Sequence, residues 1–279
     1  MKTGIIGFGF VGKATYQFDN SIIVYDINKE LCIPKNITIN DIYLCDIIFV
    51  CVPTPMNADG SVYLNIINDV INELKKNVNS NSSIIIRSTV PPGTCDNLDV
   101  FFMPEFLTEK NYLNDFVNNK NWIIGTPRIY NEIQINNIKN LIINSKIKGN
   151  IKYDLIKILN NKEAEMVKYF KNVFLSVKVS FCNEIFEYCK EKQIDYNNVI
   201  ENVCLDERIN KSHTSVPGPD GKYGFGGTCF PKDCSGLLYE FSKNNLESYI
   251  IKGAIERNNE KDRKEQDWKL SKGRAVVKN

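Results

Sequence analysis

One short stretch in the last quarter of the chain holds the residues best suited to chemistry. It reads Gly224-Phe225-Gly226-Gly227-Thr228-Cys229-Phe230-Pro231-Lys232-Asp233. Because glycine has no Cβ, the backbone at its three glycines can approach a ligand closely and adopt positive φ. A thiolate is a strong nucleophile, and a neighbouring cation such as Lys232 would lower the pKa of the Cys229 thiol. The alternative interpretation is a glycine-rich loop with a buried structural cysteine.

A second motif opens the chain. An apolar run over residues 3–6 leads into Gly7-Phe8-Gly9-Phe10-Val11-Gly12, and a second apolar run over residues 21–25 ends at Asp26. A dinucleotide site requires this order of elements: a strand, a GxGxxG turn, a helix, a second strand and an acidic residue at its end. Gly7 would make the tight turn, Gly9 would let the backbone approach the pyrophosphate, and Gly12 would let the helix pack on the strand. The carboxylate of Asp26 would bind ribose hydroxyls and repel a 2′-phosphate, which favours NAD over NADP.

Further apolar runs predict the parallel sheet that such a motif needs. They cover residues 47–52, 83–87, 100–103 and 122–125, the last of which we interpret as the final strand of the sheet. A continuous apolar run is typical of a parallel strand buried on both faces. Three of the runs lead into polar and proline-containing segments, which begin at Pro53, Ser88 and Pro104. Doubly wound sheets bind ligands at the carboxyl ends of their strands.

A long helix is predicted over residues 162–192, which contain neither proline nor glycine. An apolar stripe, expected to be core or dimer interface, recurs at steps of three or four: Met166, Phe170, Val173, Val177, Phe181, Ile185 and Tyr188. Lys168 and Asn172 lie one turn apart and therefore on one face. A solvated face is the alternative for such a pair.

Taken together, these strings resemble the UDP-glucose/GDP-mannose dehydrogenase family. The resemblance covers roughly residues 1–260 and rests on GFGGxCFPKD, the helix string E-x-x-K-x-x-x-N from Glu165, and the CVPTP, STVPPGT and PEFLxE loops in the family's order. It implies an α/β fold, with an N-terminal Rossmann-type parallel sheet and a mainly helical central domain built on one long helix. It also implies NAD as the cofactor.

The resemblance assigns roles to individual residues. Catalytic roles fall to Cys229, Lys168, Asn172, Glu109, Thr89 and Asp233. Cofactor contacts fall to Gly7, Gly9, Phe10, Val11, Gly12, Asp26, Thr54, Thr89, Glu109 and Lys232. Substrate contacts fall to Glu105, Phe106, Leu107, Lys168, Asn172, Arg208, Gly224, Phe225, Gly226 and Gly227, with Arg208 acting from a neighbouring subunit.

The reaction that the resemblance implies is a double oxidation of a nucleotide-sugar C6 alcohol to the uronic acid. Lys168 and Asn172 would stabilise the developing oxyanion. Cys229 would attack the aldehyde, and the thiohemiacetal would become a thioester on the second oxidation. Glu109 would act as general base in the hydrolysis of this thioester, with Thr89 and Asp233 as positioning groups.

Composition limits the other classes of function. The net charge of +2 gives no case for a nucleic acid or a membrane-surface partner. The nine cysteines are odd in number and scattered, which does not fit a secreted disulfide framework and favours a reducing, cytoplasmic setting. The glycine motif starts so early that we expect no signal peptide. His213 is the only histidine, so a Ser-His-Asp or Cys-His mechanism could rest on this residue alone, and we interpret it as a loop residue. No Cys/His spacing predicts a metal site.

We therefore expect an NAD-binding domain over residues 1–155, a central catalytic domain over 156–262 and a charged tail over 263–279. The family's third, nucleotide-gripping domain is expected to be absent, which makes this a short form. The segment between Thr89 and Glu105 is shorter than is usual in the family, and the segment between Arg208 and Cys229 is longer.

The expected protein is a homodimeric UDP-glucose 6-dehydrogenase-like enzyme. The alternatives are a GDP-mannose or UDP-N-acetylhexosamine 6-dehydrogenase and a non-catalytic NAD-binding remnant. A simple dehydrogenase that stops at the carbonyl is a further alternative, but it would have no need of Cys229.

Overall fold

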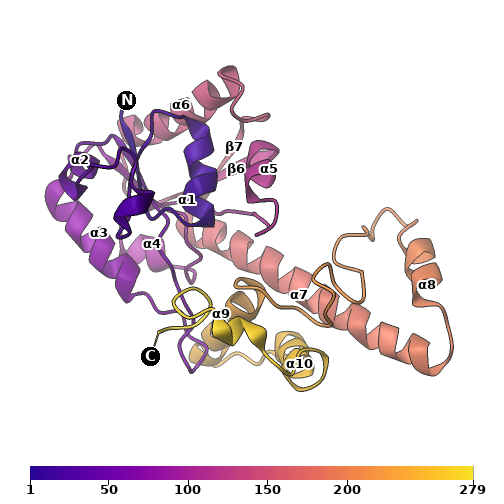
Figure 1. The fold of residues 1–279 in the computed structure, drawn as a ribbon. Helices are drawn as coiled ribbons and strands as arrows, with labels where there is room; N and C mark the ends of the chain where they lie inside the picture. The colour runs from indigo at the N-terminus through magenta and orange to yellow at the C-terminus, as the bar shows by residue number, and fades with distance from the viewer. Residues whose placement is uncertain (279) are drawn as a thin grey trace. The chain divides into compact units, whose positions relative to one another are not determined.

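The structure is a computed structural model that describes residues 1–278. The chain divides into two compact units. The N-terminal unit comprises residues 1–54 and 64–168, and the C-terminal unit comprises the inserted segment 55–63 and the chain from Tyr169 onwards. Figure 1 shows the elements of both units along the chain.

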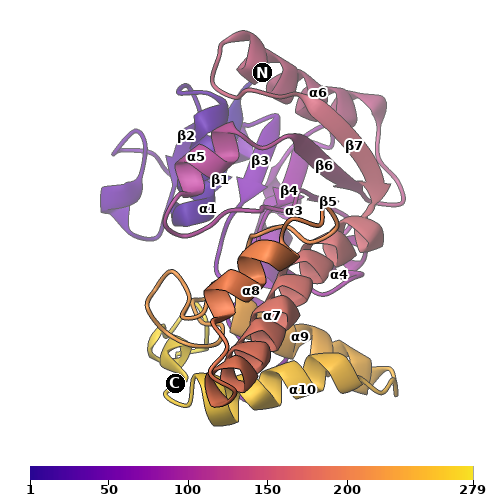
Figure 2. The ribbon, with the colours of Figure 1, turned by 90° about the vertical axis from the view of Figure 1, so that its right-hand side faces the viewer.

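The N-terminal unit is built on a seven-stranded sheet with the order β2-β1-β3-β4-β5-β6-β7. The strands are β1 (Thr3–Ile6), β2 (Ile23–Tyr25), β3 (Ile47–Val50), β4 (Ser83–Ile86), β5 (Phe101–Phe102), β6 (Asn121–Thr126) and β7 (Leu155–Asn160). The strands β1 to β5 are parallel to one another, and Figure 2 shows them beside each other. The chain places β2 on one side of β1 and β3 on the other. A doubly wound sheet binds its ligand at the carboxyl ends of the strands where the order reverses in this way.

Helices cover both faces of this sheet because alternate residues of each strand point to opposite sides. One core contains Ile5, Phe49 and Ile85, and helices α1 (Phe10–Thr15), α5 (Tyr112–Val117) and α6 (Glu132–Ile147) pack against it. The other core contains the neighbouring residues Ile6 and Ile48, and is covered by α2 (Ile39–Tyr43), α3 (Asn65–Asn77) and α4 (Thr94–Asn97). The expected Rossmann-type α/β fold is therefore confirmed.

The sheet contains one strand more than the sequence predicted. After β6, which is antiparallel to β5, the chain returns through α6 and adds β7 parallel to β6. Trp122 joins the two ends of this connection by donating its indole N–H to the Tyr153 carbonyl at 2.7 Å. β7 is an edge strand whose residues Leu155 and Ile158 remain about half exposed. It therefore lacks the buried apolar run by which the other strands were identified.

The C-terminal unit is helical. α7 (Asn161–Glu191) carries the chain into it and is followed by α8 (Tyr196–Val203), α9 (Phe230–Lys243) and α10 (Tyr249–Arg257). α9 contacts both α7 and α10: the Asn172 amide donates to Asp233 at 2.6 Å, and α9 packs beside α10 in both views of the ribbon. The one long helix predicted from the sequence matches α7 within a residue at each end.

The segment after α10 folds onto the inserted segment 55–63. The Met56 N–H donates to the Ala275 carbonyl at 2.8 Å, and the Val277 N–H donates to the Met56 carbonyl at 3.1 Å. Trp268 and Ala275 are almost completely buried. Across the described residues, no helix is both long and apolar enough to cross a membrane.

Candidate active site

The glycine motif in the N-terminal unit has the geometry of a dinucleotide loop. Gly7 has φ +90°, and a Cβ there would lie 2.8 Å from the Cys51 carbonyl oxygen. A Cβ on Gly12 would lie 2.1 Å from the Gly7 carbonyl oxygen, so only glycine lets α1 start this close to β1. Around Gly9, by contrast, a Cβ would meet nothing within 4 Å. Gly9 therefore leaves open space at the N-terminus of α1, where a pyrophosphate would approach the backbone.

Asp26 follows β2 directly and lies beside this loop. One of its carboxylate oxygens accepts from the Phe8 N–H at 2.7 Å, and the other accepts from the Asn28 N–H at 2.8 Å. These bonds fix the carboxylate next to the glycine turn, and each oxygen keeps a lone pair for another donor. The residues present therefore fit the ribose and pyrophosphate of a dinucleotide.

The ends of β3 and β4 are tied to each other rather than presented as separate polar groups. The Thr54 hydroxyl donates to the Thr89 carbonyl at 2.9 Å, and the Ser88 hydroxyl donates to the Val52 carbonyl at 2.5 Å. Thr54 and Thr89 are both buried. The cofactor contacts predicted for these two residues remain predictions, and the structure shows a bracing role for the Thr54 hydroxyl.

A buried ion pair joins two of the predicted site residues of the N-terminal unit. The Lys168 ammonium donates to the Glu105 carboxylate at 2.8 Å and to the Glu105 carbonyl at 2.8 Å, and both side chains are under a tenth exposed. Burial alone would raise the pKa of the Glu105 carboxyl. The charge and hydrogen bond of Lys168, the Leu107 N–H and the charge of Arg87 outweigh burial and hold that pKa below its usual value. Glu105 is therefore a carboxylate that orients the lysine.

Glu165, one turn before Lys168, anchors the loop after β4. Its carboxylate accepts from the Gly93 N–H at 2.5 Å and from the Cys95 N–H at 2.8 Å, and its side chain is fully buried. Burial raises the pKa of the Glu165 carboxyl to about 7, against the lowering effect of the two N–H groups. The sequence contained Glu165 only as a letter of a motif, and nothing in its spacing predicted this anchoring role.

In the C-terminal unit, Cys229 lies at the start of α9. It is the residue before Phe230, the first of the helix, and its sulfur lies 3.9 Å from the Thr228 hydroxyl. Cys229 is half-buried, and Pro231 in the first turn lets the helix begin at this point. The positive end of a helix favours an anion such as a thiolate.

At the first turn of α9, three polar side chains form a buried hydrogen-bonded array. The Asn172 amide of α7 donates to one oxygen of Asp233 at 2.6 Å, and the Lys232 ammonium donates to the other at 2.6 Å. Asp233 is completely buried, and Asn172 and Lys232 are each under a tenth exposed. A buried carboxylate flanked by a cation and an amide has fixed geometry, because any displacement would leave a charge unpaired. The structure thus brings together three of the residues that the sequence singled out.

The other predicted residues lie either at the surface or beside the Glu105–Lys168 pair. Arg208 is exposed and forms a bidentate pair with Asp206, two residues earlier. Glu109 is also exposed. Phe106 lies with its ring 5.9 Å from the Lys168 ammonium, and the Leu107 N–H donates to Glu105 at 2.8 Å. The roles predicted for these residues stay predictions.

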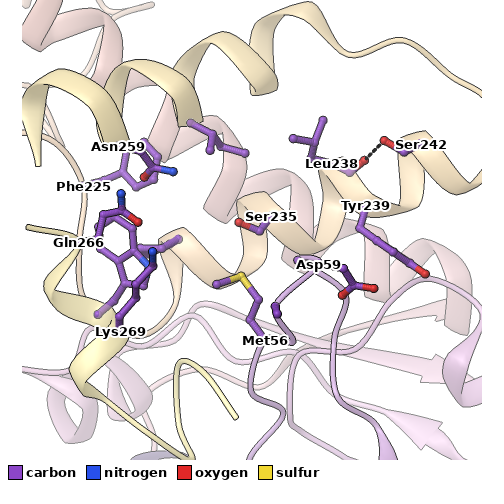
Figure 3. A pocket seen from close by; sticks show the side chains of 15 residues that line it. Met56, Asp59, Phe225, Ser235, Leu238, Tyr239, Ser242, Asn259, Gln266 and Lys269 are labelled. Carbon is purple, nitrogen blue, oxygen red and sulfur yellow. Dashed lines mark hydrogen bonds between the residues drawn. The ribbon is translucent and has the colours of Figure 1, made fainter. Parts of the chain in front are cut away.

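A cavity of about 430 Å³ lies within the C-terminal unit, next to the glycine-rich stretch. Figure 3 shows Phe225 and Asn259 on one side of it, Ser235, Leu238 and Tyr239 of α9 on another, and Met56 with Asp59 from the inserted segment. Since Phe225 belongs to the stretch that precedes Cys229, this cavity borders the candidate nucleophile loop. Among the described residues, no group of His, Cys, Asp and Glu is arranged to hold a metal ion.

The fold and these side chains together define a dinucleotide-binding protein with a cysteine-bearing glycine loop in a helical unit. The sequence models of both corresponding domains match: the NAD binding domain of the UDP-glucose/GDP-mannose dehydrogenase family over residues 33–142, and the central domain of that family over residues 162–260. The chain belongs to the UDP-glucose/GDP-mannose dehydrogenase family. Its cofactor is NAD, in agreement with the prediction from Gly7 to Asp26.

Curated relatives of this chain carry the name UDP-glucose 6-dehydrogenase. The protein of that name from Rickettsia typhi is 30% identical, over 92% of this chain and 64% of its own length. The one from Campylobacter jejuni is 29% identical, over 92% of this chain and 72% of its own length. The chain spans about half of a third relative, from Rickettsia prowazekii, which is 30% identical.

Solved structures agree with this relationship. A UDP-glucose dehydrogenase from the archaeon Pyrobaculum islandicum has a TM-score of 0.78 and 26% identity, and covers 93% of this chain and 68% of its own. A GDP-mannose dehydrogenase from Pseudomonas aeruginosa shares the fold with a TM-score of 0.65 at 24% identity, over 98% of this chain and 71% of its own.

Proposed function

We propose that this chain is an NAD-dependent nucleotide-sugar 6-dehydrogenase that oxidises the C6 alcohol twice, with UDP-glucose as its favoured substrate. The observation that carries the proposal is the position of Cys229, half-buried at the start of α9, with the Asn172–Asp233–Lys232 array at the first turn of the same helix. A protein that only bound NAD, or one that stopped at a carbonyl, would need neither the cysteine nor the buried array. Bound NAD would supply the electron acceptor for both oxidations.

The first oxidation needs a group that stabilises negative charge on the C6 oxygen as its proton leaves. Lys168 suits this role because its ammonium is buried and held by Glu105 at 2.8 Å. A cation in a water-poor site stabilises an oxyanion far better than the same cation in water. Asn172 is the second proposed donor, and its amide is oriented by Asp233. The product of this step is an aldehyde.

The second oxidation is assigned to Cys229. Its sulfur would form a bond to C6 of the aldehyde, and the carbonyl oxygen would take up a proton, giving a thiohemiacetal. Removal of two electrons and two protons overall from that adduct gives a thioester. Water then attacks C6, the C–S bond breaks, and the products are the uronate and the free thiol. Glu109 is the proposed base for the water, with Thr89 and Asp233 as positioning groups.

The choice of UDP-glucose rests on the names of the curated relatives from Rickettsia typhi and Campylobacter jejuni. GDP-mannose and UDP-N-acetylhexosamines are the alternatives, because family members with those substrates share the fold. We also propose a homodimer in which Arg208 reaches the substrate of its partner. A reducing, cytoplasmic compartment fits the requirement that Cys229 remains a thiol.

Incubation with NAD and a panel of sugar nucleotides tests the proposal, with NADH followed by absorbance. We expect two NADH per molecule of UDP-glucose for the wild-type chain, and one or none for Cys229→Ser, because a serine hydroxyl is a much weaker nucleophile. Cys204→Ser, a substitution at another half-buried cysteine, is the matched control and should keep the wild-type ratio. A ratio of two with Cys229→Ser at the wild-type rate would rule out the thioester route.

A further inference from the structure

At two of the three glycines before Cys229, other side chains of the same chain fill the space that a Cβ would take. A Cβ on Gly224 would lie 2.3 Å from the Asn258 side-chain oxygen, and a Cβ on Gly226 would lie 2.3 Å from the Arg263 guanidinium carbon. Distances below 3.0 Å essentially never occur for real Cβ atoms. A Cβ on Gly227, in contrast, would meet nothing within 4 Å. Gly224 and Gly226 therefore admit side chains from the C-terminal part of the unit, whereas Gly227 is the position left open.

Asn258 holds the backbone of Phe225 at both of its polar atoms. Its side-chain oxygen accepts from the Phe225 N–H at 2.8 Å, and its amide donates to the Phe225 carbonyl at 3.0 Å. Asn258 is completely buried, so neither bond competes with water. Asn183 of α7 adds a third bond by accepting from the Gly224 N–H at 3.1 Å.

Arg263 holds the next residue of the same loop. Its side chain is 4% exposed, and its guanidinium lies over the backbone of Gly226. Its orientation is fixed by Asp267, to which Nε and Nη2 donate at 2.9 Å each, and by Asp220, to which Nη2 donates at 2.6 Å. The Arg263 bonds in turn hold the pKa of the Asp267 carboxyl at about 2. This bidentate geometry requires a planar fork, which lysine lacks.

We infer that Asn258 and Arg263 are positioning residues that fix the glycine loop and thereby hold Cys229 at the start of α9. Only Gly227 and Thr228 separate the clamped Gly226 from Cys229. The helix fixes the chain on the other side of the cysteine. Release of the clamp would free the torsions of Gly227, a residue with φ +71° and no Cβ to restrict it. The role of this clamp in catalysis rests on the proposed function, whereas its effect on the thiol does not.

The test measures the reactivity of Cys229 directly, without cofactor or substrate. The full chain is alkylated with iodoacetamide between pH 6 and 9, and the Cys229 peptide is quantified by mass spectrometry. For Arg263→Ala and Asn258→Ala we expect labelling at pH 7 to slow by about tenfold, equivalent to about one unit in the midpoint of the pH profile, since the thiol leaves the helix N-terminus. Arg263→Lys should recover only part of the rate, because it keeps the charge and loses the fork.

Lys252→Ala is the matched control. Lys252 lies on α10, is 63% exposed and pairs with Glu256 of the same helix at 3.7 Å. Its labelling profile should stay within about twofold of wild type, below the scale of a one-unit shift. If Arg263→Ala does not fold, Arg263→Lys and Asn258→Asp, followed by circular dichroism, decide the question.

Wild-type labelling profiles in folded Arg263 and Asn258 variants would overturn the inference. The outcome is independent of the proposed reaction. A shifted profile together with two NADH from Cys229→Ser would leave the clamp established and refute the thioester route. An unshifted profile together with a second oxidation that depends on Cys229 would refute the clamp and support the thioester route.

Discussion

At the scale of single residues, the N-terminal unit contains two buried carboxylates in opposite electrostatic settings. Glu105 faces the Lys168 ammonium, and its pKa is lowered by that charge in spite of burial. Glu165 accepts from two backbone N–H groups, and burial raises its pKa to about 7. A full opposite charge stabilises a buried carboxylate better than amide dipoles do. The two residues therefore predict different responses to substitution and to pH.

Removal of one partner of the Glu105–Lys168 pair should destabilise the chain strongly. We expect Lys168→Met to lower the free energy of unfolding by about 3–5 kcal/mol, because the buried Glu105 carboxylate would lose its ion-pair partner. The double variant with Glu105→Leu should recover much of that loss. Urea unfolding measures the free energy of unfolding of the single and the double variant. Asp154→Asn in the exposed Lys146–Asp154 pair, joined at 2.6 Å, is the control and should cost less than about 1 kcal/mol. Additive losses in the double variant would contradict this assignment.

Glu165 predicts a loss of stability as the pH rises. Its folded pKa of about 7 lies above the ordinary value of 4.5, so the unfolded chain gives up this proton first. Its contribution is fully present below pH 4.5 and is lost as the pH rises through 7. The free energy of unfolding should fall by at most about 3 kcal/mol over this range, at 1.36 kcal/mol per unit.

Chemical denaturation at several pH values measures this effect. Glu165→Gln should flatten the profile, whereas Glu191→Gln, at the exposed end of α7, should leave its slope unchanged. A wild-type slope in Glu165→Gln would assign the effect to another group.

At the scale of elements, α7 shows an aromatic face that this chain does not cover. Phe170, Phe174, Phe181 and Tyr188 are between 57% and 61% exposed, and the rings of Phe170 and Phe174 stack at 6.1 Å. Val173, which the sequence placed in the same stripe, is instead buried. An exposed apolar row on a long helix is typical of an interface with another protein surface. The proposed homodimer would bury it.

The dimer prediction is tested by sedimentation velocity at micromolar concentration. Wild type should sediment as a dimer and Phe181→Glu as a monomer, because a buried, unpaired carboxylate in an apolar interface is strongly unfavourable. Ile250→Glu, at a position 70% exposed on α10, is the matched control and should remain dimeric. A monomeric wild type would refute the interface.

At the scale of the whole molecule, the chain passes between its two units three times. It enters the C-terminal unit at residue 55, returns at 64 and enters again at 169, within α7. The inserted segment 55–63 pairs through Met56 with Ala275 and Val277 near the end of the described chain. No single cut can therefore separate the two units without removing hydrogen-bonded residues from one of them.

We accordingly expect a fragment of residues 169–279 to be much less helical than the same residues in the whole chain. It lacks segment 55–63, and the unsatisfied backbone groups and exposed apolar surface left behind are unfavourable. Circular dichroism of the fragment, with and without a peptide of residues 55–63, measures this. Native helicity of the fragment alone would show that the insertion contributes nothing to folding.

The sequence by itself determined those features that depend on local order along the chain. The β1–α1–β2 unit with Asp26, the buried strands and α7 follow from glycine spacing, apolar runs and helical periodicity. The identity of the cofactor followed from the same residues. The sequence did not predict β7, because an edge strand with exposed Leu155 and Ile158 lacks the continuous apolar run of a buried strand.

Only the tertiary structure decided which polar side chains meet. The pairing of Glu105 with Lys168 joins residues 63 positions apart, and that of Asn172 with Asp233 joins residues 61 apart. The substrate contacts predicted for Gly224 and Gly226 stay predictions, and the structure adds that Asn258 and Arg263 occupy the space that a Cβ on these glycines would take. The spacing of residues along a chain does not predict such long-range contacts, because they depend on how whole helices pack. That packing is determined by many apolar contacts at once.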